Sequence, residues 1–220
     1  METQQPILWF MAMISPSFHL EKKYPSYAVV GIDEAGCGPW AGPVVAAAVI
    51  IDQSLFPETF KTRVNDSKKL TKKQRQTLFQ ELILHPCLTY HIGLATVEEI
   101  DFFNISHATR LAMRRAVDGL KVRPSYALVD GIRKPELECS VEMVVKGDQS
   151  SFSIATASIL AKVERDKIMN DLHQDFPVYG WDKNAGYGTL LHRQALRTYG
   201  VTLHHRRSFA PIRALLPTVV

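Results

Sequence analysis

The sequence predicts an α/β domain built in layers around a mixed β-sheet. Apolar runs typical of buried strands alternate along the chain with longer segments of helical periodicity, the pattern of a sheet covered by helices. The first two apolar runs are joined by only a short turn rich in Gly and Pro, which indicates a mixed rather than a purely parallel sheet. At 220 residues, 46% of them hydrophobic, the chain is long enough to bury a sizeable core, and no linker divides it.

Five short apolar runs predict the strands of this sheet. The first is followed at once by two acids, Asp33 and Glu34, and the fourth ends on Asp130. The fifth is followed by Lys146, Gly147 and Asp148. The expected strands cover residues 27–32, 44–51, 88–95, 126–129 and 141–145.

Four helices are predicted from caps and apolar spacing. Thr71 and Gln74 have the spacing of a capping box, and Pro86 stops the helix that they begin. The second helix begins at Asp101 or Asn104. The expected helices cover about residues 71–85, 101 or 104 to 120, 150–173 and 189–199, with a loop at 57–66 and a turn at 177–188.

Charge is distributed unevenly along the chain. The net charge is only +4, but residues 61–76 hold seven Lys or Arg against the single acid Asp66. From Lys183 to the end there are six Lys or Arg and no acid. Such clustering indicates a polyanionic partner better than the net charge does.

The cysteines and the N-terminus indicate a cytoplasmic protein with no membrane span. Cys37, Cys87 and Cys139 are widely spaced and odd in number, which fits neither a disulfide framework nor a thiolate metal site. The apolar run 7–14 is too short to cross a bilayer, and no Lys or Arg precedes it as in a signal peptide. We expect residues 1–25 to form an extension that either packs on the body or stays loose.

Acids at strand ends are the strongest chemical signal. If the strands that end near Asp33-Glu34, Asp130 and Asp148 are neighbours, four carboxylates converge, since ligand sites gather at strand ends in α/β sheets. Four unpaired acids repel one another unless cations bind between them, and oxygen-only ligands select Mg²⁺ or Mn²⁺. From spacing alone, scattered surface acids are an equally good interpretation.

A set of motifs over residues 27–213 resembles ribonuclease HII. In order, the motifs are GIDEAGCGPWAGPVVAAAVI, NDSKKL, HATRLAMRRAVDGL, LVDG, VVKGDQSSFSIATASILAKVERD, GYGT and HHRRSF. The resemblance implies a ribonuclease H-like fold in residues 26–220, a mixed sheet flanked by helices with a small helical C-terminal part from about residue 176. Type HIII enzymes are also similar, but the N-terminal extension has no room for their additional domain.

The resemblance also implies the activity and its catalytic residues. It implies an endoribonuclease that hydrolyses the RNA strand of RNA/DNA hybrids and incises 5′ of ribonucleotides embedded in duplex DNA, leaving 3′-hydroxyl and 5′-phosphate ends. Asp33, Glu34, Asp130 and Asp148 fall on the four catalytic carboxylates of the family. They are expected to hold Mg²⁺ or Mn²⁺, two ions when substrate is bound.

Substrate contacts are expected in four other segments. Gly36, Cys37 and Gly38 match the loop that reads the 2′-hydroxyl, although the family usually has Arg where this chain has Cys37. Either a cation near a phosphate is lost, or Cys37 is a tolerated small residue. Tyr187 matches a tyrosine that stacks on the nucleotide beside the ribonucleotide. Phosphate contacts are expected from Ser67, Lys68 and Lys69 and from Arg206 and Arg207 with His204 and His205.

Other residues have equally good structural interpretations. His107 fits a core histidine, and Lys162, Arg165 and Asp166 fit an ion network on the long helix. Two other classes of protein remain open, a catalytically silent nucleic-acid-binding module and a nuclease for DNA flaps or junctions. The expected partners are RNA/DNA hybrid and ribonucleotide-containing duplex DNA; we expect a monomer without an obligate protein partner.

Overall fold

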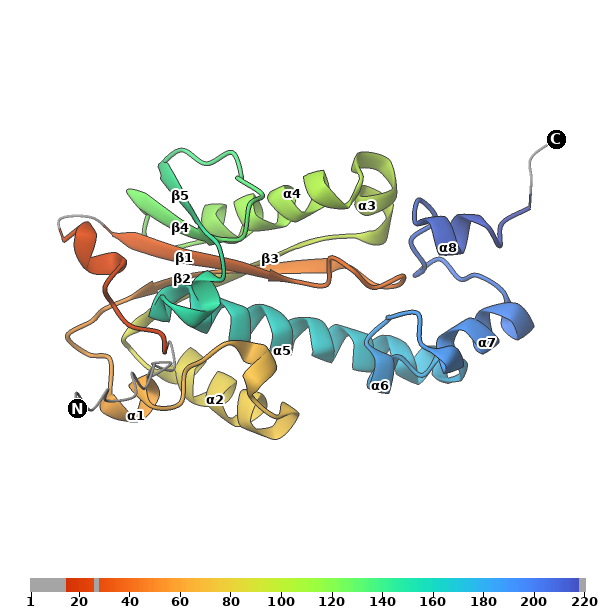
Figure 1. Ribbon diagram of the computed structural model, residues 1–220, viewed down its shortest axis with the longest axis horizontal. Helices are drawn as coiled ribbons and strands as arrows, with labels where there is room; N and C mark the ends of the chain where they lie inside the picture. The colour runs from red at the N-terminus through yellow and green to blue at the C-terminus, as the bar shows by residue number, and fades with distance from the viewer. Residues whose placement is uncertain (1–14, 26–27, 218–220) are drawn as a thin grey trace, which may run out of the picture.

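The computed structural model describes residues 15–25 and 28–217 and has a five-stranded mixed sheet at its centre (Figure 1). The strand order is β3-β2-β1-β4-β5. β1 pairs antiparallel with β2 and parallel with β4, and β4 pairs parallel with β5, so the predicted mixed sheet is confirmed. The strands are β1 (Val29–Ala35), β2 (Val44–Ile51), β3 (Leu88–Ala95), β4 (Tyr126–Asp130) and β5 (Ser140–Val144).

Helices cover both faces of the sheet (Figure 1). α5 (Phe152–Asp175) packs on β1 and β2 with α2 (Lys72–Leu84) beside it. α4 (Ile105–Asp118) packs on β2 and β3 across the other face, with α3 (Val97–Phe103) next to it. The helix α5 approaches β1 so closely at Gly31 that a Cβ there would overlap the backbone of Ser153. Only glycine fits this contact, which fixes where the long helix lies relative to the central strand.

Side chains cap the main helices, and the predicted capping box is confirmed. Thr71 and Gln74 form both hydrogen bonds of the capping box at the start of α2. Ser151 caps α5, and Thr189 caps α7 (Leu190–Tyr199). Of the two starts predicted for the next helix, Asn104 is confirmed as the cap of α4, whereas Asp101 is wrong because it lies within a separate helix, α3. Asn104 ends one and caps the next with a φ of 70°, outside any helical conformation.

Short helical turns occupy the predicted loops and form the C-terminal part. α6 (Trp181–Asn184) and α8 (Ala210–Arg213) lie with α7 at the end of α5 (Figure 1). Their side chains share a small core with Ala41 and Met169. The remaining turns are α1 (Glu58–Lys61) and the 3₁₀ helices η1 (Glu21–Lys23), η2 (Ser67–Lys69), η3 (Gly147–Gln149) and η4 (Pro177–Tyr179).

Residues 15–25 pack on the body beside the start of α5. Ser17 pairs with Ser151 in an isolated bridge, and the buried Glu21 accepts hydrogen bonds from the hydroxyls of Ser151 and Ser153. The apolar run 7–14 lies outside the described residues. Across the part of the chain that is described, no helix has the length and apolar character needed to span a bilayer.

Candidate active site

The carboxyl ends of three adjacent parallel strands meet at one edge of the sheet. Asp33 and Glu34 lie near the end of β1, and Asp130 is the last residue of β4. Asp148 lies in η3, four residues beyond the end of β5. Because β1, β4 and β5 are parallel neighbours, this topology brings the four predicted acids to the same edge.

Asp33 and Glu34 face opposite sides of β1, as neighbouring strand residues do. Asp33 is buried on the α5 side, and its Oδ1 accepts a hydrogen bond from the backbone N–H of Glu34 at 2.7 Å. Burial raises the pKa of Asp33 well above its usual range, and the charges of Glu34 and Asp130 raise it further. The pKa of Glu34 is also raised, chiefly by burial. Both acids therefore carry their negative charge at a cost in free energy.

Asp130 interacts electrostatically with each of the other three acids. Its Oδ1 accepts a hydrogen bond from the N–H of Gly147 at 2.6 Å, which connects the end of β4 to η3. Burial raises the pKa of Asp130 itself, and its charge raises the pKa values of Asp33, Glu34 and Asp148. For Asp148, burial, then Asp66, then Asp130 raise the pKa to about 6. All four acids thus lie within electrostatic reach of a single carboxylate.

Two cations lie at the rim of the acid cluster. The ammonium of Lys68 is 4.0 Å from Asp148 Oδ2, and Arg133 Nη1 is 3.4 Å from Glu34 Oε1. Desolvation lowers the pKa of Lys68, but the surrounding carboxylates outweigh it and the net shift is upward. The side chain of Lys68 is largely exposed, at 82%, and that of Arg133 is partly exposed, at 41%, so they neutralise the buried acids only in part.

The donor set fits a hard divalent cation. Carboxylates are the only side chains of the cluster that can ligate, and oxygen ligands select Mg²⁺ or Mn²⁺ over softer metals. Within residues 15–25 and 28–217, no three His, Cys, Asp or Glu side chains are already arranged to hold a metal ion. The mutual repulsion of the carboxylates in the cluster supplies the electrostatic reason for an ion to bind.

The Gly36–Gly38 loop lies beside Tyr187. A Cβ on Gly38 would be 3.4 Å from Tyr187 Cε1, so the ring lies against this glycine, and half of the tyrosine is exposed. The backbone N–H of Trp40 donates to the carbonyl of Gly186 at 2.8 Å, which connects the two segments. Gly36 has a φ of +99°, and a Cβ there would overlap the side chain of Arg165. The loop expected to read the 2′-hydroxyl and the tyrosine expected to stack on the neighbouring nucleotide therefore lie side by side.

Cys37 turns its thiol away from this surface. Its Sγ donates to Glu34 Oε1 at 3.3 Å and lies 3.3 Å from Thr109 Oγ1 of α4. Burial, with the charge of Glu34, raises the pKa of the thiol to about 11, so it stays protonated. The residue that departs from the family pattern contacts a candidate catalytic acid.

Three of the side chains predicted to contact phosphate are buried. Arg206 is fully buried, and its guanidinium donates to backbone carbonyls of residues 36–43. His205 is fully buried with its Nε2 3.0 Å from His192 Nε2. Ser67 is buried with its Oγ 2.9 Å from Ser158 Oγ. The C-terminal tail packs against the body here instead of forming an exposed basic arm.

Other basic residues remain on the surface. Lys69 and Arg207 are exposed, and the N–H groups of Arg207 and Ser208 donate to the carboxylate of Asp101. Phosphate contacts by the side chains of Lys68, Lys69 and Arg207 stay predictions. Lys162 and Asp166 form the expected ion pair on α5 at 2.7 Å, but Arg165 lies outside it.

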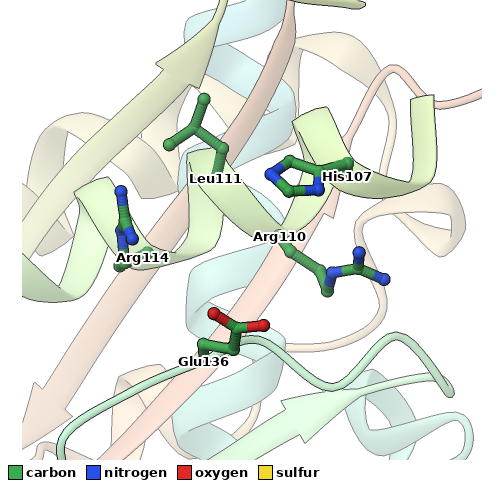
Figure 2. A pocket seen from close by; sticks show the side chains of 5 residues that line it. All are labelled: His107, Arg110, Leu111, Arg114 and Glu136. Atoms are coloured by element: carbon green, nitrogen blue, oxygen red, sulfur yellow. The ribbon is translucent and has the colours of Figure 1, made fainter. Parts of the chain in front are cut away.

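His107 is exposed, so its interpretation as a core histidine is wrong. Its ring stacks on Phe103 with centroids 4.9 Å apart. Figure 2 shows His107, Arg110 and Arg114 on α4 above Glu136 of the loop that joins β4 to β5. None of the four acids of the cluster lines this small basic pocket.

Three residues near the cluster were not among the predicted site residues. Asp66 caps η2 by accepting from the N–H of Lys68, and its charge raises the pKa of Asp148. Arg133 pairs with Glu34, and Arg165 lies behind Gly36. A cap spacing before the Lys68 turn could have pointed to Asp66. No local signal distinguishes Arg133 or Arg165 from other basic residues.

The fold and the acidic edge define the class as a ribonuclease H-like α/β protein. The family model described as Ribonuclease HII matches residues 30–212. The chain is 54% identical over 189 residues to Ribonuclease HII of Burkholderia thailandensis, covering 86% of each chain.

Solved structures of ribonucleases H2 and HII have a fold similar to that of this chain. The chain is similar to ribonuclease H2 from Pyrococcus horikoshii, known from a crystal structure, with 29% sequence identity and a TM-score of 0.72. The match covers 85% of this chain and 96% of that one. RNase HII of Archaeoglobus fulgidus, solved in a complex with PCNA, is 25% identical with a TM-score of 0.67, over 81% and 93%. The chain therefore belongs to the ribonuclease HII family, and it is a nuclease, a hydrolase of the ribonuclease H type.

Proposed function

We propose that this chain hydrolyses the RNA strand of RNA/DNA hybrids and incises duplex DNA on the 5′ side of embedded ribonucleotides, leaving 3′-hydroxyl and 5′-phosphate ends. One observation carries the proposal: the acid cluster of Asp33, Glu34, Asp130 and Asp148 at the ends of three parallel strands. Membership of the ribonuclease HII family supports the substrate class.

The same four carboxylates would hold the divalent cations, which we propose to be two Mg²⁺ or Mn²⁺ ions when substrate is bound. Such ions supply Lewis-acid activation of water and of the phosphodiester. The groups of the protein itself hold and orient the carboxylates and the phosphate. Gly147 N–H fixes one oxygen of Asp130, Arg133 lies beside Glu34, and the exposed ammonium of Lys68 stands where an incoming phosphate would meet it.

Sugar selection is proposed for the adjoining surface of Gly36–Gly38 and Tyr187. The peptide groups of the loop are close enough to the acids to contact the nucleotide whose phosphodiester is cut, because Cys37 contacts Glu34 directly. A half-exposed tyrosine ring beside them offers a stacking face for a base. The 2′-hydroxyl is the group that distinguishes RNA from DNA at such a site.

The test is to supply duplex DNA containing one ribonucleotide, with Mg²⁺ or Mn²⁺, and to map the cut. We expect incision 5′ of the ribonucleotide, and we expect Asp33→Asn to abolish it while binding to the duplex is largely retained. An all-DNA duplex of the same sequence is the matched control. Binding without incision by the unaltered protein would favour a silent binding module, and cutting of the all-DNA duplex would favour a general nuclease.

Partner proteins are a separate question. The PCNA complex of the Archaeoglobus fulgidus relative shows that a protein partner is possible within the family. We propose that the activity of this chain on nucleic acid requires no obligate partner, because the acid cluster and the sugar-recognition surface come from one chain. The incision assay with the purified chain alone tests this.

A further inference from the structure

Two buried arginines support the sugar-recognition loop from behind. Arg165 of α5 and Arg206 of the tail, here called the arginine pair, are 1% and 0% exposed. Arg165 donates to the carbonyls of Pro43, Ala185 and Ala41 at 3.0–3.1 Å. Arg206 donates to those of Gly42, Cys37, Gly36 and Pro43 at 2.6–3.1 Å. Every nitrogen of both guanidinium groups is therefore used on backbone oxygens.

The arginine pair is electrostatically unusual. Neither guanidinium forms an ion pair with a carboxylate within residues 15–25 and 28–217. Burial lowers the pKa of both arginines, and the charge of Arg165 contributes to lowering that of Arg206 to about 9. Two like charges buried without a counter-ion are costly, so packing alone is a poor reason for their presence.

The hydrogen bonds to the arginine pair set the direction of the loop peptides. In a trans peptide the C=O and N–H groups point in opposite directions. Since the carbonyls of Gly36 and Cys37 point inward to Arg206, the N–H groups of Cys37 and Gly38 point outward. No acceptor in the described part of the chain takes a hydrogen bond from either N–H group. Two donors are thus left free beside the acid cluster.

The arginine pair also connects the loop to Tyr187. Arg165 Nη1 binds the carbonyl of Ala185, two residues before the tyrosine, while its other nitrogens bind Ala41 and Pro43. One side chain therefore sets the distance between the turn that carries Tyr187 and the loop that carries the free N–H groups. Gly36 has to be glycine because Arg165 fills the space of a Cβ.

We propose that Arg165 and Arg206 are positioning residues for sugar recognition, which orient the peptides of residues 36–38 so that their N–H groups face the nucleotide beside the acid cluster. The arginines do not touch the substrate. This inference rests on the proposed function, because it assumes that the loop distinguishes ribose from deoxyribose.

The test compares binding to two duplexes, one with a single ribonucleotide and one all-DNA, by fluorescence anisotropy at fixed salt with Mg²⁺. Every protein carries Asp33→Asn so that neither duplex is cut. We expect Arg206→Met and Arg165→Met to reduce the preference for the ribonucleotide duplex by about tenfold, the value of roughly one hydrogen bond. Affinity for the all-DNA duplex should change much less.

Arg197→Met, in an exposed arginine of α7, is the matched control and should leave the preference unchanged. If the Met variants do not fold, Arg206→Lys and Arg165→Lys carry the test, because lysine keeps the charge but offers one nitrogen in place of a fork. The inference would be overturned if folded arginine variants kept the preference for the ribonucleotide duplex. It would also be overturned if affinity for the ribonucleotide duplex fell only together with affinity for the all-DNA duplex. A reference protein without any ribonucleotide preference would instead overturn the proposed function on which it rests.

Discussion

Asp148 shows how much the acid cluster costs the protein without bound cations. Burial and the neighbouring charges of Asp66 and Asp130 raise its pKa to about 6, while Lys68 is its only cation within 4.0 Å among the described residues. A carboxyl group whose pKa is higher in the folded than in the unfolded state destabilises the fold when it is ionised. The cluster therefore lowers the stability of the fold and in return provides a site where cations bind.

Replacing Asp148 by Asn should reveal this cost through its pH dependence. In the folded state the pKa is raised, so the stabilising contribution of the protonated form is present below the unfolded value of 3.8 and is lost as the pH rises through about 6. In chelator, Asp148→Asn should be more stable than the parent above that pH by about 1–2 kcal/mol, a value reduced for solvent screening.

Urea unfolding between about pH 4 and pH 8 measures the difference in free energy of unfolding between Asp148→Asn and the parent. This difference should vanish at the low-pH end of the range. Added Mg²⁺ should then stabilise the parent more than the variant. A constant difference across the pH range would contradict the assignment.

At the level of residues, the sequence placed the acids at strand ends, but it did not indicate that Arg206 is buried. The acids follow apolar runs directly, so their place at strand ends is a local property, and parallel pairing then brings them together. Arg206 looked like a surface cation because nothing near it in the sequence indicates which segment the tail meets. Its partners are about 165 residues away, in the loop of residues 36–43. Cys37 likewise faces inward because Thr109 and Glu34 contact it.

At the level of elements, the break between α3 and α4 decides between the two helix starts that the sequence left open, Asp101 and Asn104. Asn104 has φ 70° and ψ 161°, a conformation that essentially only glycine adopts without strain. Its Oδ1 accepts hydrogen bonds from the N–H groups of Ser106 and His107, which compensates for the strain by capping α4. The sequence predicted the helix that Asn104 caps but not the preceding helix α3, which ends at Phe103.

Substitution of Asn104 separates the cap from the strain. Asn104→Ala should destabilise the protein by about 1–2 kcal/mol, because the cap is lost and the strained backbone remains. Asn104→Gly loses the cap but relieves the strain, so its free energy of unfolding should lie close to that of the parent. Denaturant unfolding of the two variants checks the order, and equal losses would show that the backbone conformation carries no cost.

Elements with strong local signals were predicted almost to the residue. The strands at 44–51 and 88–95 match β2 and β3, and the Thr71 capping box begins α2 as expected. The short turns α1, α6 and α8 were not predicted as helices, because four-residue helices depend on tertiary contacts more than on their own sequence. The mixed topology was foreseeable from the short turn after β1, whereas the strand order was not.

For the whole molecule, the sheet and the C-terminal part have different tasks. The sheet brings the acids of β1, β4 and η3 to one edge, and α5 extends from that edge to the small core around Trp181. The tail returns from this core to hold the loop after β1 through Arg206. Candidate metal ligands and candidate sugar readers therefore lie next to each other at the end of β1, where Cys37 contacts Glu34.

The central claim is that the strand-end acids act as one cation-binding catalytic unit, and Asp130→Asn tests it most directly. Asp130 is the acid whose charge reaches the other three, and removing that charge lowers the repulsion that favours a bound cation. The measurement is the rate of incision of a duplex with one ribonucleotide at saturating Mg²⁺, beside the Tm and the affinity for the duplex.

We expect the rate to fall by roughly a thousandfold or more, which corresponds to the several kcal/mol that metal ions contribute to charge stabilisation. The Tm in chelator should hold or rise, and duplex affinity should be retained. A rate within about tenfold of the parent, in a folded protein that binds the duplex, would contradict the account.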